Sequence, residues 1–164
     1  MVTLSRGHVL GLALALLAAG AVLAFWPREE PGVKEAITRK VIQMTESAER
    51  KDMAELMEGV SDNFQTGEGW NKQQVKGVLL GQVLRGSWVR IFVKDLNVTE
   101  VNPSRGDVQM KIIFGRSEAE QLETLAQDSV LSAYMIEGTF EKQDDGEWRI
   151  VQARHRSLSP TELF

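Results

Sequence analysis

The chain has 164 residues and a formal net charge of −4, from 19 basic and 23 acidic side chains, and it contains no cysteine. The lack of cysteine excludes disulfides, thiolate catalysis and cysteine-rich zinc sites. No basic stripe stands out, so we expect no nucleic-acid partner. There is no phosphate-binding glycine loop or dinucleotide fingerprint, and we expect neither a cofactor nor a bound metal.

An uncharged apolar run near the N-terminus, residues 9–26, predicts a transmembrane helix. A helix of that length rises about 27 Å, which barely spans the hydrocarbon layer. Trp26 lies where an interfacial aromatic is expected, and Pro27 ends the segment. A cleaved signal peptide is the alternative, with Val22 and Ala24 at the cleavage site. The length of the run and its bulky end favour an uncleaved anchor.

The chain therefore divides into four predicted parts. They are the N-terminal region and signal-anchor (1–26), a linker (27–32), one domain (33–158) and a loose tail (159–164). The short N-terminal region with Arg6 resembles an export signal, whereas a plain count of Lys and Arg favours a cytoplasmic domain. We expect a single-pass protein of the inner (cytoplasmic) membrane with an extracytoplasmic, periplasmic domain.

Three helices are predicted after the linker. Apolar residues recur at helical spacing from Val33 to Ala48, and Asp52 is a suitable N-cap for a second, short helix. Asn71 caps a third helix, in which Gly77 and Gly81 predict close packing because glycine disfavours a helix by about 1 kcal/mol. The face of the third helix expected to be inward holds Val75, Val78, Leu79 and Val83.

From Val89 the apolar period changes to two, which predicts about four antiparallel strands. The first strand has a kink near Asp95, and a capping box at Ser117 predicts a short helix between later strands. Trp148 is expected to be buried. The remaining strands are predicted over residues 108–114, 130–142 and 148–155.

Helices followed by antiparallel strands predict an α+β fold, with a curved sheet packed on three helices. Residues 48–56 (AERKDMAEL) and 146–151 (GEWRIV) resemble an inter-helix junction and the last strand of the nuclear transport factor 2-like superfamily. The resemblance covers residues 33–157 and implies that family's cone-shaped, cystatin-like fold. In many relatives a histidine falls six residues after the tryptophan, whereas here Arg154 has that position and His155 follows.

This one-residue offset leaves two alternatives, because neighbouring residues of a strand point to opposite faces. Either His155 faces solvent and Arg154 faces the cavity, or a bulge restores His155 and turns Arg154 outward. A fixed cation in the cavity suits an anionic ligand better than proton abstraction. The candidate ligand-binding residues are Tyr134, Arg154, His155 and Trp88.

No catalytic residue is assigned. His155 is the one histidine after the anchor, and no carboxylate is placed to form a pair with it. Asp62 and Asp95 are single carboxylates for which a capping or turn role is expected. The aromatic residues either fill the core or line a cavity between sheet and helices.

Three functions compete. The first is a non-catalytic envelope module that binds a small ligand or an envelope protein, and the second is a small lyase, isomerase or hydrolase. The third is a scaffold subunit, since the architecture is similar to the inner-membrane scaffold proteins of type IV secretion. Without a recognisable acid–base pair, we favour binding or scaffolding. We also expect a homodimer through the sheet face, whose outward residues would be Arg149, Val151 and Ala153.

Overall fold

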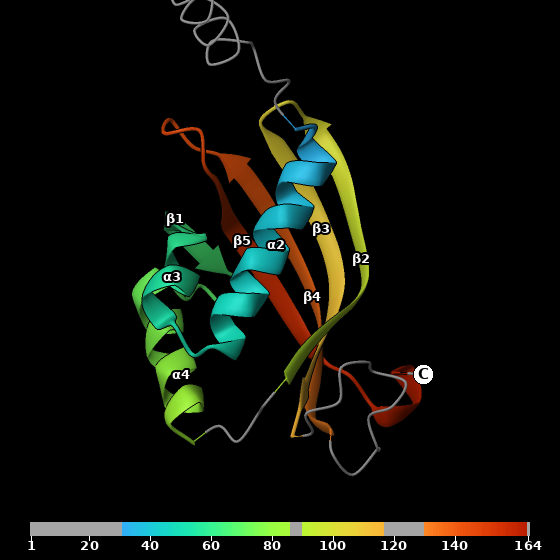
Figure 1. Ribbon diagram of the computed structural model, residues 1–164. Helices are drawn as coiled ribbons and strands as arrows, with labels where there is room; N and C mark the ends of the chain where they lie inside the picture. Colours follow the sequence, from blue (N-terminus) through green and yellow to red (C-terminus); the bar gives the residue numbers. More distant parts are fainter. Residues whose placement is uncertain (1–30, 86–89, 117–129, 164) are drawn as a thin grey trace, which may run out of the picture. The chain divides into compact units, whose positions relative to one another are not determined.

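The computed structural model describes the domain that follows the predicted anchor (Figure 1). The chain divides at residue 31, and the unit that starts there, residues 31–164, is described here. The predicted anchor, Trp88 and the helix predicted from Ser117 lie outside the described residues. None of the described helices is long and apolar enough to cross a membrane. The described residues are 31–85, 90–116 and 130–163.

The first two helices form where the sequence predicts them. Helix α2 (Val33–Glu49) buries a stripe of apolar residues spaced by four, centred on Ile37. Helix α3 (Met53–Glu58) begins after Asp52, whose side chain accepts a hydrogen bond from the backbone N–H of Glu55 at 3.0 Å. This bond satisfies one of the free N–H groups of the first turn, and it confirms the predicted N-cap.

Helix α4 (Lys72–Arg85) starts with a reciprocal cap. The backbone N–H of Gln74 donates to Asn71 Oδ1 at 3.0 Å, and the backbone N–H of Asn71 donates to Gln74 Oε1 at 2.9 Å. Each side chain thereby satisfies an N–H group at the start of the helix, as in a capping box. The predicted role of Asn71 is confirmed.

Two predictions about the inner face of α4 are wrong. Val75 and Leu79 pack against the core, but Val78 is exposed. A methyl group on Gly77 would meet no atom within 4 Å, so this glycine does not mark close packing. The physical reason is that α4 packs mainly on β1 and α3, so the part of the helix that carries Val78 and Gly77 is left open.

A strand that was not predicted, β1 (Val60–Thr66), lies between α3 and α4. It pairs in parallel with the last strand, with Val60 opposite Ile150 and Thr66 opposite Ala153. The sheet therefore has five strands instead of about four. Polar residues interrupt β1, so its sequence lacks the clean alternation by which the other strands were recognised.

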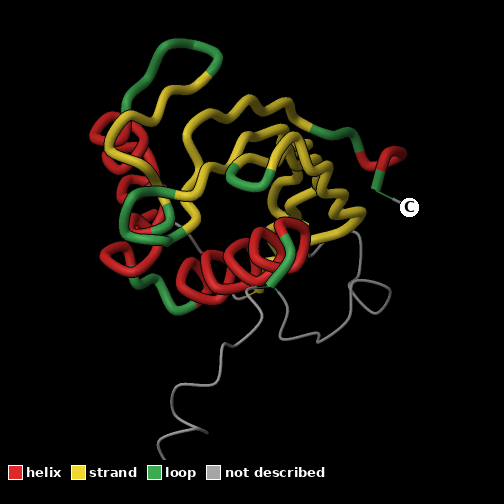
Figure 2. The backbone as a smooth tube through the Cα atoms, turned by 90° about the horizontal axis from the view of Figure 1, so that it is seen from above, coloured by secondary structure: helices red, strands yellow, loops and turns green. Residues whose placement is uncertain are grey.

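The strand order in the sheet is β1-β5-β4-β3-β2. Figure 1 shows α2 lying across one face, and Figure 2, viewed from above, shows the strands curving around the helices. We call the face that carries α2 the core face and the opposite face the outer face. The four longer strands are β2 (Arg90–Asn102), β3 (Arg105–Gly115), β4 (Val130–Lys142) and β5 (Trp148–Ser157).

The kink predicted in the first of these strands is confirmed. Asp95 has a φ of 54°, and the register of β2 on β3 shifts between Lys94 and Asn97. Aspartate tolerates this left-handed conformation better than most residues. Its carboxylate lies 2.8 Å from Lys111 Nζ, which ties the kink to β3.

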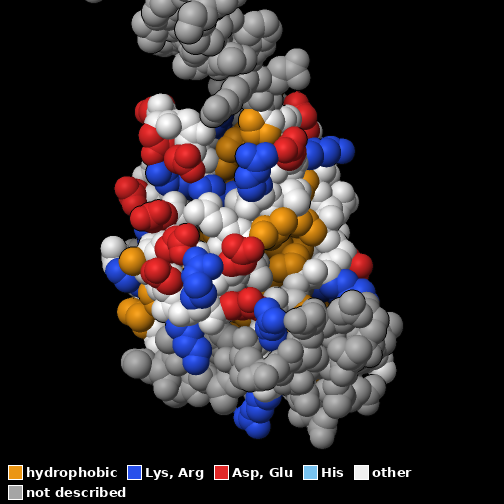
Figure 3. Space-filling model, in the orientation of Figure 1, with side chains coloured by type: hydrophobic (Ala, Val, Ile, Leu, Met, Phe, Trp, Pro, Cys, Tyr) orange, Lys and Arg blue, Asp and Glu red, His pale blue; other side chains and the backbone are white. Residues whose placement is uncertain are grey.

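The main core lies between α2 and the core face. Ile37 and Phe140 are its most deeply buried large side chains, and Trp148 is buried beside them, as predicted. On the surface that carries α2, acidic and basic side chains are interspersed (Figure 3). One such pair joins Lys40 Nζ to Glu147 Oε2 at 2.8 Å.

The C-terminal segment is not the loose tail that was predicted. Residues Pro160–Glu162 form a 3-10 turn, and Leu163 is buried against Ile113 and Ala133. Side chains alternate between the two faces along β3, and Ile113 lies on the face opposite to the core-facing Val108 and Met110. The contact with Leu163 therefore covers one end of the outer face. The buried leucine thus anchors a segment in which Ser159, Thr161 and Glu162 are polar.

This segment should loosen in acid. The backbone N–H of Ser159 and the guanidinium of Arg156 both bind the Glu162 carboxylate, and together they lower its pKa from 4.5 to about 2. Because the folded pKa is the lower one, the stabilisation is fully present above pH 4.5 and is lost as the pH falls through about 2. We expect the Leu163 methyl signals in NMR spectra to move toward random-coil shifts in that window.

A matched variant checks that Glu162 is the titrating group. Glu162→Gln keeps the shape of the side chain but has no ionisable proton, so its Leu163 signals should not titrate between those pH values. Identical titrations in the two proteins would show that another carboxylate controls the segment.

Candidate functional site

A bulge in β5 decides which side chains reach each face of the sheet. Phe140 and Thr139 are neighbours on β4, and they pair with Ile150 and Gln152. Val151, between these two, therefore has no partner on β4. One extra residue turns every later side chain to the opposite face. His155 therefore lies on the core face and Arg154 on the outer face, which is the second of the two predicted alternatives.

The same bulge corrects one of the predicted outward residues of β5. Ala153 packs against the main core instead of facing outward. Arg149 precedes the bulge, and its guanidinium is already engaged. Its Nη2 lies 2.6 Å from Asp145 Oδ2, and its Nε donates to the Glu58 carbonyl at 3.0 Å. Beyond the bulge, the outward surface of β5 is polar and consists of Gln152, Arg154 and Arg156.

Three aromatic rings meet on the core face near the end of the sheet. The centroid of Tyr134 is 6.2 Å from that of Phe114 and 5.9 Å from that of His155, with edge-on geometry in both cases. His155 Nδ1 is 4.0 Å from Glu68 Oε1, and both side chains are 47% exposed. The structure thus brings Tyr134 and His155 together, but the Glu68 carboxylate beside His155 is neither buried nor within hydrogen-bond reach.

The other carboxylates considered from the sequence are engaged in ion pairs. Asp62 is 94% exposed and lies 2.9 Å from Lys72 Nζ, and Asp95 is paired with Lys111. In each case the hydrogen bond to the lysine is the main cause that holds the carboxyl pKa below its usual value. A general base needs the opposite shift, in a dry environment. Among the described residues, no group of three His, Asp or Glu side chains could hold a metal ion.

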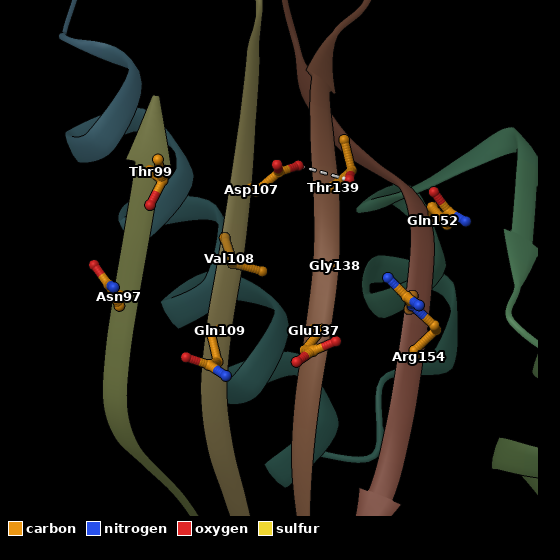
Figure 4. A pocket seen from close by; sticks show the side chains of 11 residues that line it. Asn97, Thr99, Asp107, Val108, Gln109, Glu137, Gly138, Thr139, Gln152 and Arg154 are labelled. Atoms are coloured by element: carbon orange, nitrogen blue, oxygen red, sulfur yellow. Dashed lines mark hydrogen bonds between the residues drawn. The ribbon is translucent and has the colours of Figure 1, made fainter. Parts of the chain in front are cut away.

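A groove of about 290 Å³ lies on the outer face (Figure 4). Figure 4 shows the helices behind the sheet, so the groove opens on the side away from α2. The side chains come from all four long strands and are mostly polar. They include Asn97 and Thr99 of β2, Asp107 and Gln109 of β3, Glu137 and Thr139 of β4, and Gln152 and Arg154 of β5.

Of the three predicted ligand-binding residues that the structure describes, Arg154 lines this groove, whereas Tyr134 and His155 do not. Sequence reasoning missed the groove because its side chains become neighbours only through the strand register. A signal was present: each long strand carries polar residues two positions apart, such as Asp107 with Gln109 on β3. Alternation of this kind marks a face directed away from the core.

No family model matches the sequence, and no curated protein matches it. Solved structures do match. A cystatin-like protein of unknown function from Nostoc punctiforme gives a TM-score of 0.59 at 11% identity, covering 77% of this chain and 92% of that one. A nuclear transport factor 2-like protein from Rhodospirillum rubrum gives 0.58 at 11% identity, covering 75% and 98%.

A hexachlorocyclohexane dehydrochlorinase from Novosphingobium barchaimii gives a TM-score of 0.55 at 13% identity, covering 76% of this chain and 83% of that one. Similarity at such low identity shows the fold alone. The five-stranded curved sheet with three helices is therefore the cystatin-like, nuclear transport factor 2-like α+β fold that the sequence resemblance implies.

Proposed function

We propose that this chain is a membrane-anchored envelope protein whose extracytoplasmic domain is a non-catalytic binding module, with the outer groove as its binding site. One observation carries the proposal: the groove gathers amide, hydroxyl, carboxylate and guanidinium groups from four strands. Such groups give a ligand both donors and acceptors without supplying a tuned acid or base.

The assignment of a binding role rests on the state of the candidate acids and bases. Asp62 and Asp95 are ionised partners of lysines, and His155 and Tyr134 have no buried carboxylate beside them in the described part of the chain. Proton transfer needs a group whose pKa is tuned by burial or by a close neighbour. Binding needs only the fixed polar surface that the sheet provides.

The membrane part of the proposal rests on the apolar run of residues 9–26. Its test is fractionation of cells that express the untruncated chain. We expect the mature protein to sediment with membranes at full length. A soluble form that begins near Phe25 would show that the run is a cleaved signal peptide.

The groove assignment is tested by NMR. The full-length chain in detergent micelles is screened against a library of small polar molecules, with amide shifts as the readout. We expect hits to move the amides of Gln109, Glu137 and Arg154, which lie on three different strands of the groove. Hits that instead move Tyr134 and His155 would transfer the binding site to the core face.

A small pocket enzyme is the second candidate. The Tyr134–His155 ring contact on the core face favours it, as does the similarity to a structure described as a dehydrochlorinase. If that activity exists, Tyr134→Phe and His155→Gln should abolish turnover, whereas Arg154→Gln on the opposite face should not. If the domain is a non-catalytic binding module, no turnover is expected in the unmodified protein either.

A homodimer or an envelope protein partner on the sheet face stays a prediction. Arg154 and the other groove residues are polar, and Leu163 covers one end of the same face. A partner would therefore meet a polar surface in the centre of the sheet. Small-angle scattering of residues 31–164 at micromolar concentration measures the mass, and a monomer would contradict the homodimer.

A further inference from the structure

Two opposite charges in the outer groove face each other across neighbouring strands without pairing. Glu137 of β4 is directly opposite Arg154 of β5, yet neither forms an ion pair within the part of the chain that the structure describes. Arg105 and Glu141, which are directly opposite across β3 and β4, do pair at 3.3 Å. Opposite charges in such positions normally attract, so the separation of Glu137 from Arg154 needs a cause.

The cause is the turn that follows β1. A methyl group on Gly67 would lie 2.7 Å from Cγ and 3.1 Å from Cδ of Arg154, so the stem of Arg154 lies directly over this glycine. The backbone N–H of Gly67 donates to the Ala153 carbonyl at 2.9 Å, which fixes the turn beside β5. Because β1 and β4 flank β5 on opposite sides, a stem that leans toward Gly67 leans away from Glu137.

A third charge in the groove is held in place by a hydrogen bond. The hydroxyl of Thr139 donates to Asp107 Oδ1 at 2.8 Å, and Thr139 is itself buried (Figure 4). The second oxygen of Asp107 has no hydrogen-bond partner among the residues that the structure describes. The groove thus presents two carboxylates and one guanidinium, and its remaining polar side chains are neutral amides and hydroxyls.

We propose that the groove binds a free basic α-amino acid, with lysine as its simplest form; this inference rests on the proposed function of the groove. Such a ligand has one carboxylate and two cations, the complement of the three charges present. The ligand carboxylate pairs with Arg154 and its α-ammonium with Glu137, whose strands are about 5 Å apart. The side-chain cation reaches Asp107. A volume of about 290 Å³ lies at the small end of ligand sites and suits a single amino acid.

Calorimetric titration of the full-length chain in detergent tests the ligand class. L-Lysine should bind saturably. Alanine lacks the side-chain cation and Nα-acetyl-lysine lacks the α-ammonium, so each should bind at least about tenfold more weakly. Glutamate should not bind, because its side chain would meet the Asp107 carboxylate. Equal affinities for lysine, alanine and glutamate would overturn the proposal.

Variants test the placement of the charges. Glu137→Gln and Arg154→Gln should each weaken lysine binding by at least about tenfold, and Gly67→Ala should weaken it by displacing the Arg154 stem. Glu141→Gln is the matched control, because Glu141 lies on the same face of β4 but does not line the groove. Lysine affinity that is unchanged in Glu137→Gln and Arg154→Gln would overturn the proposal.

The failure of this inference differs from failure of the proposed function. If lysine does not bind but other polar molecules move the groove amides in the NMR screen, the basic amino acid is the wrong ligand and the groove remains the binding site. If no molecule moves the groove amides and hits move Tyr134 and His155 instead, both proposals are wrong.

Discussion

Trp148→Ala is expected to lower the free energy of unfolding by about 3–5 kcal/mol. Trp148 begins β5, is 8% exposed and belongs to the main core, together with Ile150 on the same face. Truncation removes a large apolar side chain from the interior and leaves a cavity that the neighbouring residues fill only in part. Urea unfolding of residues 31–164, followed by circular dichroism, measures the change.

Trp70→Ala is the matched control for this prediction. Trp70 is 39% exposed, and its alanine variant should change the free energy of unfolding by less than about 1 kcal/mol. The contrast between two tryptophans removes general effects of losing an aromatic residue. Equal unfolding midpoints for the two variants would show that the register of β5 is wrong.

Ile37→Ala should cost about 2–5 kcal/mol. Ile37 of α2 is 0% exposed and belongs to the main core. Ile37 packs directly on Gly106 of β3, where an added methyl group would lie only 2.5 Å from Ile37 Cδ1. Because Gly106 has no side chain, it cannot fill the space that the substitution leaves. The same urea unfolding experiment measures the loss.

The control lies on the same helix. Ile42 is 51% exposed, and Ile42→Ala should change the free energy of unfolding by no more than about 0.5 kcal/mol. Helix propensity changes in the same direction in both variants, so the difference between them reports burial. A loss of unfolding free energy at Ile42 as large as that at Ile37 would show that the buried face of α2 is assigned incorrectly.

The longer elements were predictable because each one keeps a single period. The strand predicted over residues 130–142 has the same bounds as β4. The helical spacing of apolar residues from Val33 predicts the helix that the structure shows as α2. β1 was missed because charged and amide residues at its centre interrupt the alternation. The packing of Leu163 was missed because one buried residue in a polar segment makes no period.

The site was predictable only up to a choice between two arrangements. The sequence indicates that His155 and Arg154 face opposite ways, but not which faces the core. That depends on the bulge at Val151, whose β-branched side chain is typical of a regular strand. The outer groove was out of reach for a similar reason. Asp107 and Glu137 are thirty residues apart in the sequence, and only the register of β3 on β4 makes them neighbours.

The unpaired residue in β5 affects how this strand can be compared with others. An ungapped alignment with a regular strand matches residues of the same face only up to Ile150, and after that it matches Arg154 with residues that face a core. A gap placed at Val151 restores the correspondence. By the same logic, loss of the single codon for Val151 would remove the bulge but keep His155 beside Tyr134 and Arg154 on the outer face, because every other residue of β5 would retain its partner on β4.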